Sequence, residues 1–106
     1  MTTPAEYTTR VVEDVVYERG SQNKKWGTQR HPDGTEERFV PLAEEAKTFC
    51  DEAFKDGTGT WRHILQEEVA EAFAESDPVK LRAELVQVAA VAVAWVEAID
   101  RREVKP

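Results

Sequence analysis

Hydrophobic side chains recur every three or four residues along most of this chain, which is the spacing of one face of an α-helix. The pattern predicts four helices, at residues 4–20, 42–55, 61–75 and 78–102. Gly20 can end the first helix, and the pattern also allows that helix to continue as far as Trp26. The sequence therefore predicts an all-α protein.

Signals for a helix start stand before three of these segments. Thr3 precedes Pro4, and Asp77 precedes Pro78. Thr60 stands directly before the third helix. A hydroxyl or carboxylate at this position accepts a hydrogen bond from the first free N–H groups, and proline suits the first helical position. The starts of these helices are therefore better defined than their ends.

Residues 27–41 separate the first two helices and show no hydrophobic period. They contain Pro-Asp-Gly at 32–34, which is a turn signal. Loops this long are uncommon in compact domains and are often functional. We therefore expect a functional loop here.

The fourth predicted helix is apolar on nearly every side. Between residues 85 and 99 only Gln87 and Glu97 are strongly polar. Val86 and Val93 point away from the inward stripe, so a lone protomer would leave them in water. A helix of this kind is covered on more than one side. The sequence thus predicts a four-helix bundle-like protomer that forms a homo-oligomer, with positions such as Val12, Val15, Phe49 and Leu85 facing inward.

Length and charge limit the classes of partner. The 106 residues fit a single domain, residues 1–106, and the net charge is −7, from 14 Lys and Arg against 21 Asp and Glu. A polyanion partner normally needs a basic face, so we expect no nucleic acid polymer. A small phosphorylated ligand remains possible, because a bound divalent cation reverses the local field.

Three features predict an intracellular protein. The single cysteine, Cys50, cannot form an internal disulfide, which fits a reducing cytoplasm. The N-terminus has no basic region followed by an apolar run, so no signal peptide is expected. Residues 85–99 are too short to span a bilayer. We therefore expect a cytoplasmic protein with no membrane partner.

Two glutamates lie within the apolar stripes of the third and fourth helices. Glu68 follows Ile64 by four residues, and Glu84 precedes Val88 by four residues. An unpaired buried carboxylate costs several kcal/mol, so each of these side chains needs a partner. The connection at residues 76–77 is short enough to make the two helices antiparallel neighbours.

In that arrangement Glu68 and Glu71 can face Glu84. Converging acids repel one another, and a hard divalent cation such as Mg²⁺ relieves the repulsion because it takes carboxylate oxygens as ligands. Two alternatives stay open. Arg82 could pair with one of the acids, or Glu-Glu-x-x-Glu could be a solvated helix face.

The acidic pattern resembles a known family. Residues 67–71, Glu-Glu-Val-Ala-Glu, are followed by Glu-Leu-Val-Gln at 84–87. This resembles the MazG-like all-α nucleoside triphosphate pyrophosphohydrolases, whose signature is EExxE and then ExxD on the next helix. The resemblance covers residues 61–101, and Lys-Trp-Gly-x-Gln at 25–29 is similar to phage and actinobacterial members.

The resemblance implies roles for particular residues. Glu68, Glu71 and Glu84 would be ligands of Mg²⁺, with Mn²⁺ as a possible substitute, and Glu67 would belong to the same cluster. Gln87 stands where the signature has Asp; its carbonyl can still bind Mg²⁺ but adds no negative charge. The implied reaction converts a nucleoside triphosphate to a monophosphate and pyrophosphate, with Glu67 and Glu68 as the catalytic acids. The implied assembly is a homodimer or a dimer of dimers.

A basic and aromatic segment offers chemistry for the nucleotide. An indole ring can stack on a base, an amide can read its edge, and cations can meet phosphates. The candidate substrate-binding residues are Lys24, Lys25, Trp26, Gln29, Arg30 and His31. In the alternative interpretation, Trp26 closes the core and the lysines are solvated.

Two other chemically active side chains suggest no function. Cys50 has no basic partner nearby in the sequence, so a nucleophilic role is not expected. His63, one turn before the acids, is a lone histidine of the kind that usually satisfies a local contact. The rival to an enzyme is a non-catalytic helical module that oligomerises or binds nucleotide at a degenerate metal site, and Gln87 is its best support.

Overall fold

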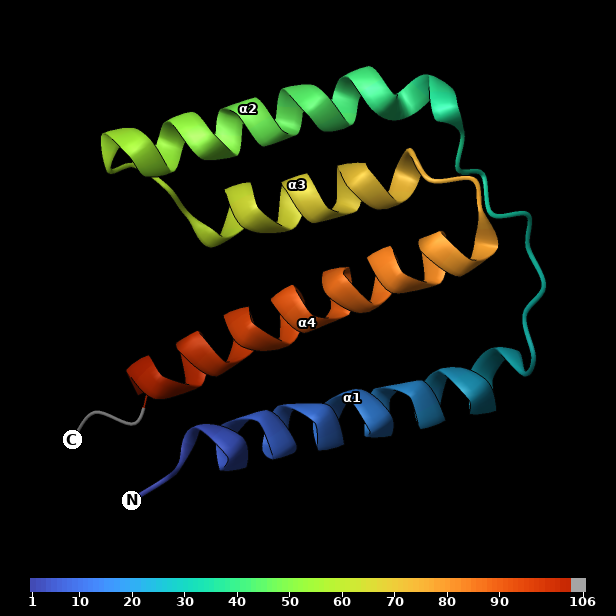
Figure 1. The fold of residues 1–106 in the computed structure, drawn as a ribbon. Coiled ribbons are helices and arrows are strands. Elements are labelled where there is room, and N and C mark those ends of the chain that lie inside the picture. The colour runs from blue at the N-terminus through green and yellow to red at the C-terminus, as the bar shows by residue number, and fades with distance from the viewer. Residues whose placement is uncertain (104–106) are drawn as a thin grey trace. The chain divides into compact units, whose positions relative to one another are not determined.

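The computed structural model describes residues 1–103, and its regular secondary structure is entirely helical, with no strand in that range (Figure 1). This confirms the all-α prediction and the number of helices. The elements are α1 (Pro4–Trp26), a 3₁₀ turn η1 (Glu37–Phe39), α2 (Val40–Asp56), α3 (Trp61–Phe73) and α4 (Pro78–Glu103). Not one of these helices combines the length and the apolar character needed to cross a membrane.

The chain divides into two compact units, each described here by itself. The first contains residues 1–32 and the described residues from 93 onward, so it holds α1 and the second half of α4. The second contains residues 33–92, with η1, α2, α3 and the first half of α4.

Helix α1 continues through Gly20, which resolves one of the two predicted alternatives. Glycine inside a helix is destabilising by roughly 0.5–1 kcal/mol. Here the guanidinium of Arg19 donates to Gln22 Oε1 at 2.7 Å and to Asn23 Oδ1 at 3.0 Å. These side-chain bonds span the glycine and stabilise the turn that contains it. The helix ends at Gly27.

The predicted loop at 27–41 is too long at its C-terminal end. Residues 37–39 form η1 and α2 begins at Val40, because Pro41 suits the first turn of a helix. The C-terminal part of the remaining loop, residues 33–36, belongs to the second unit, where the N–H of Glu36 donates to the carbonyl of Phe73 at 3.0 Å. The α3 helix ends at Phe73, two residues earlier than predicted.

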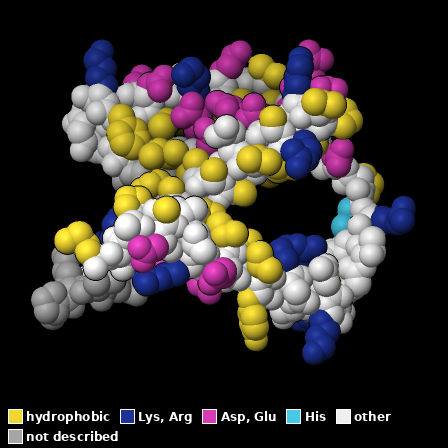
Figure 2. Space-filling view, turned by 60° about the horizontal axis from the view of Figure 1, so that its bottom comes forward, with side chains coloured by type: hydrophobic (Ala, Val, Ile, Leu, Met, Phe, Trp, Pro, Cys, Tyr) yellow, Lys and Arg dark blue, Asp and Glu magenta, His cyan; other side chains and the backbone are white. Residues whose placement is uncertain are grey.

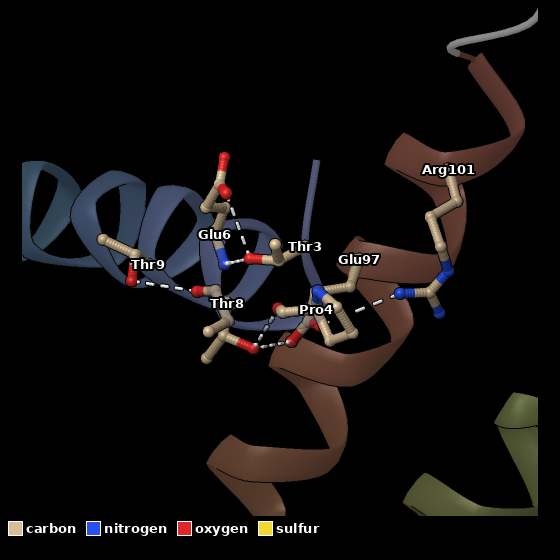
Figure 3. Close-up of polar contacts among 8 residues, drawn as sticks. Thr3, Pro4, Glu6, Thr8, Thr9, Glu97 and Arg101 are labelled. Carbon is tan, nitrogen blue, oxygen red and sulfur yellow. Dashed lines mark hydrogen bonds and ion pairs between the residues drawn. The ribbon is translucent and has the colours of Figure 1, made fainter. Parts of the chain in front are cut away.

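Polar contacts join the two helices of the first unit (Figure 3). Thr3 caps α1 by accepting from the N–H of Glu6 at 3.2 Å. One turn later the Thr8 hydroxyl donates to Glu97 Oε2 on α4 at 3.1 Å. Glu97 also pairs with Arg101 at 3.8 Å, and that guanidinium lies 5.6 Å from the centroid of the Tyr7 ring. The start of α1 is thereby attached to the end of α4.

In the second unit α2 and α3 run antiparallel side by side (Figure 1). The turn between them depends on Gly59, because a Cβ there would lie 2.5 Å from the Phe54 ring. Thr60 then caps α3, as predicted. This tight turn fixes the register of α2 against α3. The buried apolar residues of the unit are Cys50, Ala53, Ala72 and Leu81.

Many large apolar side chains stay exposed, including four that the sequence predicts to face inward. Val12, Val15, Phe49 and Leu85 are between 43% and 57% exposed, so the inward prediction is wrong for a lone protomer. Figure 2 shows hydrophobic side chains at the surface among acidic ones. The other exposed large apolar residues of α2 to α4 are Val40, Leu42, Phe54, Phe73, Val79, Val86 and Val96.

This exposure predicts self-association. Val86 is 52% exposed on α4, and burying a valine contributes about 1.5 kcal/mol. Light scattering at micromolar protein should therefore give at least twice the chain mass of 12.0 kDa. Val86→Glu should reduce that mass while circular dichroism keeps the wild-type helix signal. A wild-type mass of one chain would contradict the prediction.

Candidate metal centre

Three carboxylates converge in the second unit. Glu68 and Glu71 lie one turn apart on α3, and Glu84 lies in the first half of α4. One oxygen from each can be chosen so that all three lie within 4.8 Å of one another, and each side chain is half-buried. The short connection starts α4 at a defined point, because Asp77 Oδ2 accepts from the N–H of Lys80 at 3.2 Å. Helix spacing and this start together bring the acids to one place.

The environment of the cluster disfavours negative charge. Burial is the main cause that raises the pKa of Glu68, and the charges of Glu84 and Glu67 raise it further. Burial also raises the pKa of Glu71, followed by the charges of Glu68, Glu84 and Glu67 and a hydrogen bond with Glu84. The acids therefore repel one another and lack full hydration.

No basic side chain within residues 1–103 forms an ion pair with these acids. The ion pairs of the described chain are Arg38–Glu36, Lys47–Asp51 and Arg101–Glu97. Arg82, the predicted competitor, is exposed and belongs to none of them. The cluster is thus without a protein counter-charge in the part of the chain described.

The donor set fits a hard divalent cation. Mg²⁺ binds carboxylate oxygens at about 2.0–2.1 Å, so opposite ligands stand about 4.2 Å apart. The carboxylates lie within 4.8 Å, and a small side-chain movement would bring all three into one coordination shell. A cation there would also offset the burial and, after it, the mutual repulsion that raise the pKa of Glu68 and Glu71.

Glu67 contacts a different helix from the other acids. Its carboxylate acts on the Cys50 thiol of α2. Burial is the main cause that raises the pKa of Cys50 to about 11, followed by hydrogen bonding and charge from Glu67, so the thiol stays protonated at neutral pH and is a poor nucleophile. The charge of Glu67 still acts on the cluster, because it contributes to the raised pKa of Glu68 and Glu71. Sequence reasoning missed this contact; the only signal was Cys50 on the predicted inner side of α2.

Gln87 lies on α4 three residues after Glu84, so its side chain projects about 60° around the helix from that acid. The side chain is exposed, and within residues 1–103 its amide forms no hydrogen bond. It is free to supply a neutral oxygen.

The predicted substrate-binding residues all belong to the first unit. Lys24, Lys25 and Trp26 form the last turn of α1, while Gln29, Arg30 and His31 follow Gly27. Trp26 is 57% exposed, so the alternative in which it closes the core is wrong. The structure brings Trp26, Gln29, Arg30 and His31 together around one surface cavity, but Lys24 and Lys25 do not line it.

His63 has a structural role at the start of α3. Thr60 Oγ accepts from the backbone N–H of His63 at 3.3 Å, and His63 Nδ1 accepts from the backbone N–H of Thr60 at 3.2 Å. This reciprocal pair is a capping box, with histidine in the place that usually holds Glu or Gln. His63 is thus a satisfied residue.

Comparison with models of protein families finds no match for this sequence, and neither curated proteins nor solved structures match it. The resemblance to the MazG-like family therefore stays a prediction. Function has to be argued from the geometry of the site.

The raised pKa of Glu71 predicts how stability depends on pH. Below about pH 4 the side chain is protonated in both the folded and the unfolded chain and has no effect. As pH rises, ionisation of Glu71 costs the folded state more free energy than it costs the unfolded chain. The free energy of unfolding of the metal-free protein therefore falls. Glu71→Gln should therefore raise Tm by about 2 °C or more at pH 7 in chelator, with no gain at pH 4.

Thermal unfolding followed by circular dichroism measures this difference. Glu52→Gln is a matched control, because Glu52 is exposed on α2 and does not belong to the acidic cluster. A Glu71→Gln variant less stable than wild type at pH 7 in chelator would show that the acids do not repel.

Proposed function

We propose that this protein is a magnesium-dependent nucleotide pyrophosphohydrolase of the MazG type, acting in the cytoplasm as a homodimer or dimer of dimers. One observation carries the proposal: Glu68, Glu71 and Glu84 bring oxygens from two helices within 4.8 Å of one another. Within residues 1–103 no basic side chain pairs with these acids, and this absence and the raised pKa values of Glu68 and Glu71 support a cation at this place. Mn²⁺ has similar ligand preferences and would substitute.

Glu68, Glu71 and Glu84 would hold the ion, and Gln87, one helical turn after Glu84, would add a neutral oxygen. A bound Mg²⁺ would supply positive charge to the phosphates and make a nearby water more acidic. In the reaction a water oxygen bonds to the α-phosphorus, and the bond from that phosphorus to the bridging oxygen breaks. The products are a nucleoside monophosphate and pyrophosphate.

Glu67 is suited to take the proton that this water loses. Its charge acts both on Glu68 and Glu71 of the cluster and on the Cys50 thiol of α2. A carboxylate has about four lone-pair sites, so acceptor capacity remains. Removal of a proton in the transition state typically contributes 10²–10⁴-fold in rate.

A second candidate function is a non-catalytic module that oligomerises or binds nucleotide. The neutral Gln87 favours it, because the fifth acidic position of the signature carries no charge here. The large exposed apolar surface also suits assembly without chemistry. Turnover distinguishes the two candidates.

The decisive experiment incubates the protein with a panel of nucleoside triphosphates and Mg²⁺ and assays pyrophosphate. We expect release from at least one nucleotide, and none in chelator. Mg²⁺ or Mn²⁺ should also raise Tm, and Glu68→Ala with Glu84→Ala should abolish both effects. Glu44→Ala with Glu52→Ala, which removes two exposed acids of α2, is the control. No divalent-ion binding by calorimetry, with or without nucleotide, would refute the metal centre.

Gln87→Asp should tighten divalent-ion binding, because it adds a charged oxygen one turn from Glu84. Calorimetry should show about a tenfold lower Kd, in line with the effect of ligand changes on metal sites. The pyrophosphate assay should show equal or higher turnover. Unchanged binding would place Gln87 outside the coordination shell.

A further inference from the structure

The end of α1 and the residues after it form a surface cavity in the first unit. Gly27 ends the helix with φ of 65°, and its N–H donates to the carbonyl of Asn23 at 2.8 Å. After this turn, residues 28–31 share a cavity of about 540 Å³ with Trp26. Small-molecule sites span about 300–1,000 Å³, so a nucleobase has room here.

Trp26 offers this cavity an aromatic surface. The indole is 57% exposed, which is high for the last turn of a helix that has apolar neighbours to bury. The ammonium of Lys25 lies 4.9 Å from the ring centroid and covers one face. Every nucleobase can stack on such a ring, so Trp26 supplies affinity without selecting among bases.

His31 fixes the orientation of the neighbouring amide. Its Nε2 lies 3.1 Å from Gln29 Oε1. Because an amide oxygen only accepts, this contact requires the tautomer that carries its proton on Nε2. The oxygen of Gln29 is therefore directed to His31, and the NH₂ group is the free end of the side chain. Gln29 presents hydrogen-bond donors to a ligand.

The rest of the cavity lining is also rich in donors. Arg30 carries a guanidinium, which only donates, and Thr28 carries a hydroxyl, which can donate or accept. None of the five lining residues is acidic. Because donors predominate, the lining favours a ligand that brings acceptors. Uracil, thymine, guanine and hypoxanthine carry a carbonyl oxygen at the position where cytosine and adenine carry an amino donor.

We propose that the cavity at Trp26 to His31 selects nucleobases with this carbonyl, the 4-oxopyrimidines and 6-oxopurines, over the corresponding amino bases. The proposal rests on the proposed function for the presence of a nucleotide and adds the class of base. A carbonyl accepts from the Gln29 NH₂ group. An amino base would place its own N–H donor opposite the Gln29 NH₂ group. Neither donor would then have an acceptor, and binding would be weaker.

The test measures binding of nucleoside monophosphates to the full chain by calorimetry in chelator, so that neither metal nor turnover is needed. Uridine monophosphate should bind about tenfold tighter than cytidine monophosphate, and inosine monophosphate about tenfold tighter than adenosine monophosphate. Gln29→Glu replaces the donor with an acceptor and should reverse both preferences. Gln22→Glu adds the same charge to α1 outside the cavity and should leave them unchanged.

His31→Ala tests the positioning role. Without the imidazole the Gln29 amide can rotate and exchange its oxygen and NH₂ positions. The ratio of the dissociation constants for amino and oxo bases should therefore fall toward one, while each affinity changes little. Equal affinity of wild type for oxo and amino bases, absence of nucleotide binding, or a preference that Gln29→Glu leaves unchanged would each overturn the proposal. Base discrimination without pyrophosphate release would refute the enzyme and leave this inference standing; release without discrimination would do the reverse.

Discussion

The packing of the second unit has to accommodate one unfavourable interaction. Half-buried carboxylates from α3 and from the first half of α4 repel one another. Glu68, Glu71 and Glu84 meet there without a basic partner in the described chain. The apolar contacts of the unit have to outweigh this repulsion. Ala72 and Leu81, at 1% and 6% exposed, lie on the same two helices, and the small alanine allows close packing. The three acids thus lower the stability of the metal-free fold at this place, as is common at functional sites.

Local signals explain why much of this arrangement could be predicted. The starts of α1, α3 and α4 follow from Thr3, Thr60 and Asp77, because capping acts within a few residues. The convergence of the acids follows from helix spacing and a short connection, which are also local. The end of the long loop was misjudged because η1 and Pro41 extend the helical segment without a hydrophobic period.

Other features lie beyond the reach of a single sequence. Whether α1 continues through Gly20 depends on side-chain hydrogen bonds from Arg19, and intrinsic helix propensities do not include such bonds. The contact between Glu67 and Cys50 depends on the register of α2 against α3, and that register is set by Gly59 against the Phe54 ring. Burial of Phe49 and Leu85 was wrongly predicted because a helix stripe shows which residues share a face, and not what covers that face.

The protonated thiol of Cys50 makes this residue a reporter of opening between α2 and α3. It is the only cysteine of the chain, and it is 6% exposed. Its pKa of about 11 against an ordinary value of 9.0 lowers the reactive thiolate about a hundredfold while the helices stay closed. We therefore expect alkylation mainly from molecules in which α2 has separated from α3. The rate of a simple thiol reaction would then report the population of that opened state.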